Sequence, residues 1–515
     1  MRHPAPEHVP CGPSRHGWVP RASAAKLTRL SSTAFDPAAS GLGNSFLRAV
    51  AAMTLRQVLG NATMYATTLL LAWWLSPTNF GAFAVATSVI GLVTLMGELG
   101  LGAALVQRSR VPQPGDLGTL FGLHLLLFGG LAALVFGLAP SLVRFYGLPP
   151  HEVAPFRALA LTCWLPALRS VPTALLERRL AFDRVAVIET AGVLAYQGVL
   201  ILAVARGAGL WSLAAASATR GLMEALLAAH YQPWRPARPS DWATLAALLP
   251  VGLGLHGVRL LALAKDSLGP LVIGPLLGLA DVGVLQWAVL YAGVPVYFTN
   301  LVVRVAFPAF ARAQGRPEEL ATLLRLALRL SLAVGLPTAF ALTIWAPDVI
   351  GALSGPAWHR AVPVIRALFP NMVAGLAIGI LFALLTGTGA LGPSLRLFLG
   401  WTAATYALAL AALGAGLGVF GVAAAYSAAT VVALAATARV ARRIVGALPL
   451  DGLRAALMAT LPVALVAGLD QLHRMPAWLG LLLAVGLSGA VLIAQQRATL
   501  RALLAQPLQS PTDAA

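Results

Sequence analysis

The sequence predicts an all-α integral membrane protein with about 14 transmembrane helices, arranged as two six-helix lobes related by a pseudo-twofold axis plus two C-terminal helices. Three observations lead to this fold class: the composition, the spacing of apolar runs with the arginines between them, and an internal repeat. Of the 515 residues, 58% are hydrophobic and 10% are charged, whereas a soluble domain carries about 25% charged residues. A chain this apolar must be covered by lipid rather than by water.

About fourteen apolar runs reach the length of about 20 residues that crosses the hydrocarbon core of a bilayer. They lie near residues 53–75, 80–106, 117–139, 154–176, 185–205, 209–230, 243–276, 280–303, 321–346, 361–387, 393–415, 418–438, 453–471 and 477–494. The start of the chain is rich in Pro, Ser, Ala and Arg and lacks the apolar run of a secretory signal. We therefore expect a disordered cytoplasmic tail over 1–48, an N-terminal lobe over 49–232, a C-terminal lobe over 241–445, two extra transmembrane helices over 450–496 and a cytoplasmic tail over 497–515.

Arginine is distributed unevenly over the loops between these runs. With the N-terminus placed inside, the inner junctions carry roughly three times as many arginines as the outer ones. The inner set is Arg108, Arg110, Arg178, Arg179, Arg184, Arg235, Arg238, Arg312, Arg316, Arg396, Arg439, Arg442, Arg443, Arg454, Arg497 and Arg501, and the outer set is Arg144, Arg157, Arg206, Arg360 and Arg474. Because positive loops stay in the cytoplasm, we expect a multi-pass protein of the bacterial inner membrane with both termini cytoplasmic.

Two motifs recur at an offset of about 200 residues. Leu75-Ser-Pro-Thr-Asn-Phe80-Gly81 precedes the second span, and Leu277-Gly-Leu-Ala-Asp-Val282-Gly283 precedes the eighth. Gly209-Leu-Trp211-Ser-Leu-Ala214 opens the sixth span, and Gly418-Val-Phe420-Gly-Val-Ala423 opens the twelfth. Repeats of six spans share one orientation, which gives a pseudo-twofold axis along the membrane normal. This arrangement is typical of transporters that carry substrate between their two halves.

Several stretches in a fixed order resemble a known family. They are Ala72-Trp-Trp-Leu-Ser-Pro-Thr-Asn-Phe-Gly-Ala-Phe83, Gly97-Glu-Leu-Gly-Leu-Gly-Ala-Ala-Leu-Val-Gln107, Val171-Pro-Thr-Ala-Leu-Leu-Glu-Arg-Arg-Leu-Ala-Phe182, Gly209-Leu-Trp211 and Val305-Ala-Phe-Pro308-Ala-Phe. Together they make residues 50–445 similar to the Wzx-like oligosaccharide flippases of the multidrug/oligosaccharidyl-lipid/polysaccharide exporter superfamily. Each stretch alone is apolar and rich in glycine, so the specificity lies in their order and spacing.

The resemblance implies two six-helix lobes around a central cavity and transport by alternating access. It implies that the cargo is a polyprenyl-diphosphate-linked oligosaccharide, moved from the cytoplasmic to the periplasmic leaflet for exopolysaccharide or O-antigen biosynthesis. The expected partners are this cargo, the lipid bilayer and a coupling cation, either H⁺ or Na⁺. We expect the chain to act as a monomer and to need no cofactor.

Basic residues inside the predicted spans are candidates for binding the cargo, because an ionisable group in a membrane usually faces a cavity or a partner. A diphosphate needs cations, and guanidinium binds it with two parallel hydrogen bonds. The candidate substrate-binding residues are Arg56, Arg259, Lys265 and Arg366. Lys265 is one of only two lysines in the chain. The alternative for Lys265 is a buried pair with Asp266 that only positions helices.

Acidic residues inside the spans are candidates for ion coupling. Glu98 and Asp266 are the residues chosen, and Glu98 could instead pair with Arg56 in the first lobe. Arg169 in the fourth span is a further charge within the membrane. Arg220 and Glu224 stand four residues apart in the sixth span, a spacing that suits a local ion pair, and we interpret that pair as structural.

Other function classes lack their sequence signatures. Gly252-Leu-Gly254-Leu-His-Gly257 fits a dinucleotide fingerprint but lies inside an apolar span with no strand before it, so it is discarded. The nine histidines do not cluster as metal ligands, and no basic domain stands apart for nucleic acid. The outer loops are too short for the catalytic domain of a membrane enzyme. The alternative that remains is another exporter of the same superfamily, such as a drug/cation antiporter or a peptidoglycan lipid flippase.

Overall fold

The computed structural model describes residues 60, 63–98, 102, 105, 112–237, 265 and 268–447, with short pieces at 457–458, 460–467, 479–480, 483 and 486–488. All regular structure within these residues is helical, which confirms the predicted all-α class. Nine helical stretches within the described residues are long and apolar enough to cross a membrane, one of them being Pro150–Arg178, which contains two consecutive helices. The predicted tails over 1–48 and 497–515 lie outside the described residues, and the predicted domain boundaries stay predictions.

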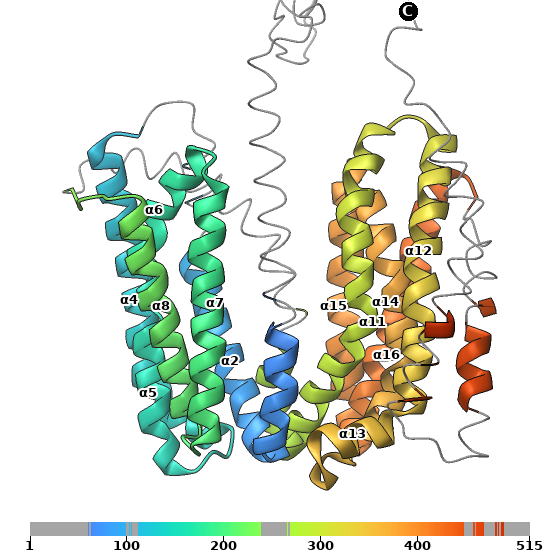
Figure 1. Cartoon of the computed structure of the whole chain (residues 1–515), viewed down its shortest axis with the longest axis horizontal. Coiled ribbons are helices and arrows are strands. Elements are labelled where there is room, and N and C mark those ends of the chain that lie inside the picture. The colour runs from blue at the N-terminus through green and yellow to red at the C-terminus, as the bar shows by residue number, and fades with distance from the viewer. Residues whose placement is uncertain are drawn as a thin grey trace, which may run out of the picture.

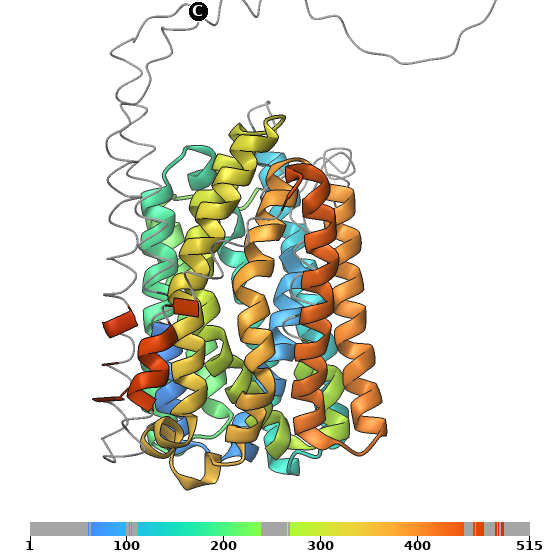
Figure 2. The ribbon, with the colours of Figure 1, turned by 90° about the vertical axis from the view of Figure 1, so that its right-hand side faces the viewer.

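The described helices form two groups, which Figure 1 shows standing side by side. The N-terminal lobe holds helical residues 63–74, then α2 (Pro77–Glu98), α4 (Pro114–Phe145), α5 (Val153–Thr162), α6 (Leu165–Arg178), α7 (Phe182–Ala205) and α8 (Trp211–Tyr231). The C-terminal lobe holds α10 (Gly269–Leu277), α11 (Leu279–Arg312), α12 (Pro317–Ile344), α13 (Ala346–Ser354), α14 (Ala361–Gly387), α15 (Leu391–Gly414) and α16 (Gly418–Val445). Figure 2 shows the long helices of the C-terminal lobe running side by side along one direction.

One predicted span carries a short interruption. The run over 154–176 forms α5 and α6, which together make up one candidate span over Pro150–Arg178, with a turn at Cys163 and Trp164 between them. Pro166 follows this turn, and a proline removes a backbone donor and clashes with the preceding helical turn. The interruption therefore has a local cause, and the predicted span is confirmed.

Many large apolar side chains are exposed along the helices. Leu126 is 69% exposed and Leu226 is 68% exposed, and many other leucines are exposed by 40% or more. A soluble monomer rarely exposes apolar patches on this scale. Together with the nine long apolar helical stretches, this surface identifies a multi-pass membrane protein whose outer faces contact lipid.

The two lobes touch where α2 crosses α11, through a reciprocal pair of glycines. A Cβ atom on Gly81 would overlap the carbonyl oxygen of Leu279, and a Cβ atom on Gly283 would overlap the carbonyl oxygen of Pro77. These four residues belong to the two motifs that recur in the sequence. A twofold relation between the halves produces this kind of mutual contact, because each motif uses its glycine to admit the backbone of the other.

Two aromatic residues extend this contact, each reaching from one lobe into the other. Trp358 of the C-terminal lobe donates its indole N–H to the carbonyl oxygen of Ala72 at 3.0 Å. Tyr146 of the N-terminal lobe donates its hydroxyl to the carbonyl oxygen of Leu271 at 3.1 Å. Burial raises the pKa of Tyr146, so its hydroxyl keeps the proton that it donates. Trp358 also meets the ring of Phe80 edge-on, at 5.3 Å between ring centroids.

The lobes are joined at one end only, as far as the described helices go. We call it the α13 end, because α13 lies there; the ribbons of the two lobes diverge toward the other end (Figure 1). Buried residues of both lobes form one continuous apolar cluster that includes Leu71, Phe80, Trp287 and Trp358. The other end carries the helix termini and turns with the following arginines, and we call it the arginine end: Arg178, Arg179, Arg184, Arg235, Arg312, Arg316, Arg396, Arg439, Arg442 and Arg443.

Replacing Gly81 with leucine is expected to separate the lobes at the α13 end, because the new side chain would occupy the space of the α11 backbone. Spin labels on cysteines at His151 and Ala357, both exposed at that end, would report the distance. The background would carry serine at Cys11 and alanine at Cys163. Gly91→Leu is the matched control, since no atom lies near a Cβ there. An unchanged distance in Gly81→Leu would contradict the account of this contact.

Trp358→Phe is expected to weaken closure by ~0.5–1.5 kcal/mol, the net value of one hydrogen bond, because it keeps the ring and removes the donor to Ala72. The same label pair should show a larger population at long distance. Trp401→Phe is the control, because it removes an indole hydrogen bond to Thr430 within one lobe. If both variants change the distance equally, the Trp358 bond has no special role between the lobes.

Candidate functional site

Two adjoining cavities lie beside the contact between the lobes. The first, of about 590 Å³, is lined by Gly60, by the helical residues 63–71, by α2, α7 and α8, and by Gln286, Val289 and Leu290 of α11. The second, of about 440 Å³, lies within the N-terminal lobe and is lined by α2, α5, α6, α7 and α8. Thr87, Tyr196, Leu213 and Arg220 line both. Each volume is within the usual range of ligand sites, about 300–1,000 Å³.

The first cavity has a lining that is mostly neutral. Hydroxyl and amide groups are spread among apolar side chains, and they come from Thr63, Thr67, Thr68, Thr87, Thr190, Tyr196, Gln197 and Gln286. Within the described residues that line it, Arg220 is the one charged side chain. Such a surface offers hydrogen bonds to an uncharged polar ligand and a cation at one edge.

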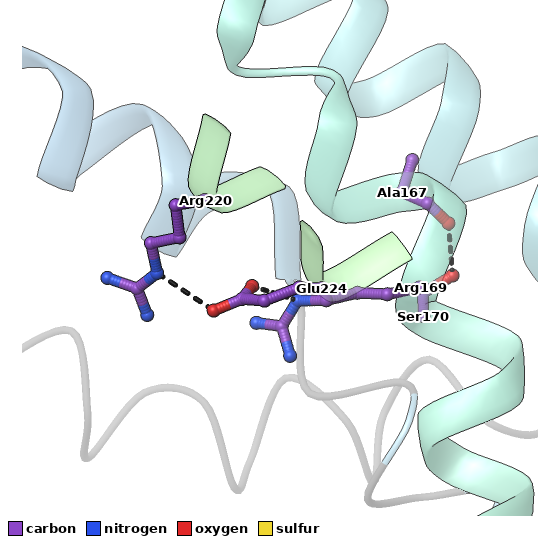
Figure 3. A network of polar contacts seen from close by, with 5 residues as sticks. All are labelled: Ala167, Arg169, Ser170, Arg220 and Glu224. Carbon is purple, nitrogen blue, oxygen red and sulfur yellow. Dashed lines mark hydrogen bonds and ion pairs between the residues drawn. The ribbon is translucent and has the colours of Figure 1, made fainter. Parts of the chain in front are cut away.

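The second cavity holds a cluster of charges around Glu224. The Oε1 atom of this carboxylate accepts a hydrogen bond from Nε of Arg220 at 2.8 Å, and its Oε2 atom lies 3.0 Å from Nε of Arg169. The Glu224 side chain is only 4% exposed, while those of Arg169 and Arg220 are 19% and 43% exposed. Figure 3 shows the carboxylate between the two guanidinium groups. Two cations therefore share one buried anion at the wall of the cavities.

Local sequence explains how three helices bring these groups together. The break after α5 sets the course of α6, and α6 carries Arg169. Gly221 lets Leu165 of α6 lie close to α8, because a Cβ there would be 2.7 Å from that of Leu165. Gly192 of α7 leaves room for the carboxylate, because a Cβ there would be 2.5 Å from Glu224 Oε1.

Arg169 and Arg220 keep N–H donors that Glu224 does not use. A guanidinium carries five N–H donors, and Glu224 engages only the Nε side of each arginine. The terminal nitrogens of Arg220 point away from the carboxylate in Figure 3, whereas the Arg169 guanidinium lies beside it. Planar guanidinium forks suit phosphate oxygens, to which they donate parallel hydrogen bonds. The cluster can accordingly receive an anion from the cavity.

The residues predicted from the sequence to bind cargo do not line these cavities within the described part of the chain. Arg56, Arg259 and Asp266 lie outside the described residues. Lys265 places Nζ 4.3 Å from the centroid of the Trp401 ring, in the C-terminal lobe, and Arg366 is an exposed residue of α14. Neither Lys265 nor Arg366 lines the two cavities described above. The substrate-binding role of these residues stays a prediction.

Glu98, chosen for ion coupling, lines the second cavity together with Glu224. Its coupling role also stays a prediction. The expected pair between Arg220 and Glu224 is present. Sequence reasoning did not join Arg169 to that pair, since the two positions lie in different helices and no local spacing links them.

The chain matches the family described as polysaccharide biosynthesis protein over residues 70–363, which is more than half of its length. The chain belongs to that family. This membership confirms the resemblance that the sequence motifs indicate.

Three relatives are about one quarter identical to this chain. It is 26% identical over 305 residues to the succinoglycan biosynthesis transport protein ExoT of Rhizobium meliloti (strain 1021), covering 59% of this chain and 61% of that protein. It is 25% identical over 298 residues to the lipopolysaccharide biosynthesis protein WzxC of Escherichia coli (strain K12), covering 56% and 59%. It is 26% identical over 279 residues to the teichuronic acid biosynthesis protein TuaB of Bacillus subtilis (strain 168), covering 53% and 56%. The chain thus spans about three fifths of the length of these relatives.

Two solved structures share the fold. The lipid II flippase MurJ in an inward closed conformation superposes with a TM-score of 0.68 at 12% identity, covering 88% of this chain and 100% of that one. An inward-facing multidrug resistance transporter of the MATE family superposes with a TM-score of 0.62 at 18% identity, covering 77% and 98%. At these identities the likeness concerns the fold alone, and it agrees with the predicted transporter architecture.

Gly192→Val is expected to displace the Glu224 carboxylate and lower the free energy of unfolding by ~1–3 kcal/mol through overpacking. Thermal unfolding of the purified protein would measure this. Gly198→Val on the same helix is the control, because no atom lies near a Cβ there. Equal unfolding temperatures for the two variants would show that Gly192 makes no room for the cluster.

Proposed function

We propose that this chain is a flippase that moves a polyprenyl-diphosphate-linked oligosaccharide across the bacterial inner membrane by alternating access. Its pathway would be exopolysaccharide or O-antigen biosynthesis. Family membership supports a role in polysaccharide biosynthesis. The observation that carries the mechanism is the cavity beside the lobe contact, with the cation of Arg220 at its edge.

The cavity chemistry suits the two parts of this cargo. The diphosphate is anionic and would meet the terminal nitrogens of Arg220 and Arg169. The sugar is neutral and rich in hydroxyls, and it would meet the threonine, tyrosine and glutamine side chains of the first cavity. The polyprenyl chain would remain in the surrounding lipid, where burial of each methylene is favourable.

The proposed orientation follows from the arginines. Positive loops favour the cytoplasmic side, so the arginine end would face the cytoplasm, with both termini there, and the α13 end would face the periplasm. With the lobes joined at the α13 end, this conformation would load cargo from the cytoplasmic leaflet. The chain would act as a monomer, and H⁺ or Na⁺ would drive the cycle, with Glu98 as the coupling group.

A second candidate function is another transport role within the same superfamily, such as drug/cation antiport or flipping of a peptidoglycan precursor. The fold likeness to MurJ and to a MATE transporter is common to both roles. The two arginines that share one carboxylate favour an anionic cargo over a cationic drug. A peptidoglycan lipid carries the same diphosphate chemistry, so the sugar would distinguish it.

Arg220→Ala is expected to reduce transport of a polyprenyl-diphosphate oligosaccharide in proteoliposomes by about 10–100-fold, the value of one or two hydrogen bonds to a charged group. Arg220→Lys should lose less, because it keeps the charge and loses the fork. Arg360→Ala is the control, since Arg360 pairs with Asp281 at the α13 end, outside the cavities. Full transport activity of Arg220→Ala would show that Arg220 does not contact the cargo.

A further inference from the structure

We propose that Glu224 acts as an internal counter-anion, which competes with the diphosphate of the cargo for Arg169 and Arg220 and so limits how tightly the cargo is held. This inference rests on the proposed function, because it assumes an anionic cargo in the cavities. It assigns Glu224 a role beyond that of a structural ion pair.

The first observation is that one carboxylate occupies both guanidinium groups. Its two oxygens lie 2.8 Å from Arg220 Nε and 3.0 Å from Arg169 Nε. Within the described part of the chain, no second carboxylate forms an ion pair with either arginine, and Arg220 also lies within electrostatic reach of the Tyr196 hydroxyl. The charge of Glu224 therefore offsets two cations that an apolar environment would otherwise penalise.

The second observation is that the carboxylate is built into the protein. Glu224 is 3% exposed, and the missing side chain of Gly192 leaves the space that it fills. An exposed surface pair would be screened by water and worth little. Here the interaction is largely shielded, so the charge of Glu224 bears directly on any anion that reaches the same arginines.

The third observation is that the hold on Arg169 is incomplete. The buried Nε atom of Arg169 makes no hydrogen bond of good geometry, although it lies 3.0 Å from the carboxylate. The contact is therefore an ion pair without an aligned donor, and it is more easily exchanged than the bond from Arg220. A ligand that offers better aligned oxygens can replace it.

Competition follows from charge. A diphosphate bound to the terminal nitrogens of both arginines brings further negative charge beside Glu224, and the two anions repel each other. The diphosphate must then either displace the Glu224 carboxylate from the arginines or bind despite the repulsion between the two anions. A transporter needs this limit, because a site that binds too strongly does not release its cargo.

The test uses the purified full-length protein and inorganic pyrophosphate as the probe, with binding measured by calorimetry. Glu224→Gln removes the competing charge and keeps the shape and one oxygen acceptor. We expect it to tighten pyrophosphate binding by about tenfold and to slow transport of the lipid-linked oligosaccharide. Glu224→Asp keeps the charge and should bind close to wild type. Glu319→Gln, which neutralises an exposed carboxylate paired with Arg316, is the matched control and should change neither.

The outcomes separate this inference from the proposed function. Weaker or unchanged pyrophosphate binding in Glu224→Gln, with binding lost in Arg220→Ala, would overturn the competition and leave the cargo site in place. If Arg220→Ala still binds pyrophosphate, or if the wild type does not bind it, the proposed diphosphate site itself is contradicted. If Glu224→Gln does not fold, Glu224→Ala answers the same question. If Glu224 had only a structural role, Glu224→Gln would weaken pyrophosphate binding and slow transport. In the proposed role, Glu224→Gln tightens pyrophosphate binding and slows transport.

Discussion

The close crossing of α2 and α11 is the constraint on which the rest of the structure depends. Gly81 and Gly283 each admit the backbone of the other lobe, and no larger residue would fit at either position. Trp358 and Tyr146 each add a hydrogen bond between the lobes. Since these contacts lie at the α13 end, they fix where the lobes meet and where the cavities can form, farther along the same helices.

The charges in the N-terminal lobe follow a second constraint, which is the cost of ions in an apolar environment. Arg169 and Arg220 can exist there because Glu224 lies between them, and Glu224 can be buried because Gly192 leaves space for it. The same arrangement leaves guanidinium donors directed away from the carboxylate (Figure 3). In the proposed function, the same cluster would both offset the buried charges and offer donors to an anionic cargo.

Much of the fold could be predicted from the sequence, because apolar length and helical spacing are local signals. The all-α class, the recurring motifs and the pair of Arg220 with Glu224 all depend on short segments. The interruption at Cys163 and Trp164 also has a local signal, because Pro166 follows it directly. The contact of Trp358 with Ala72 joins positions 286 residues apart, and no spacing in the sequence indicates it. For the same reason sequence reasoning missed that Arg169 belongs with Glu224, since these two residues lie in different helices.

The proposed function requires that a lipid-linked anion, rather than a cationic drug, crosses through this fold. Transport by the wild-type protein alone would test this, in proteoliposomes that contain either a polyprenyl-diphosphate oligosaccharide or a cationic dye. We expect the lipid-linked oligosaccharide to reach the opposite leaflet and the dye to stay where it is. Transport of the dye without movement of the lipid-linked oligosaccharide would contradict the proposed function.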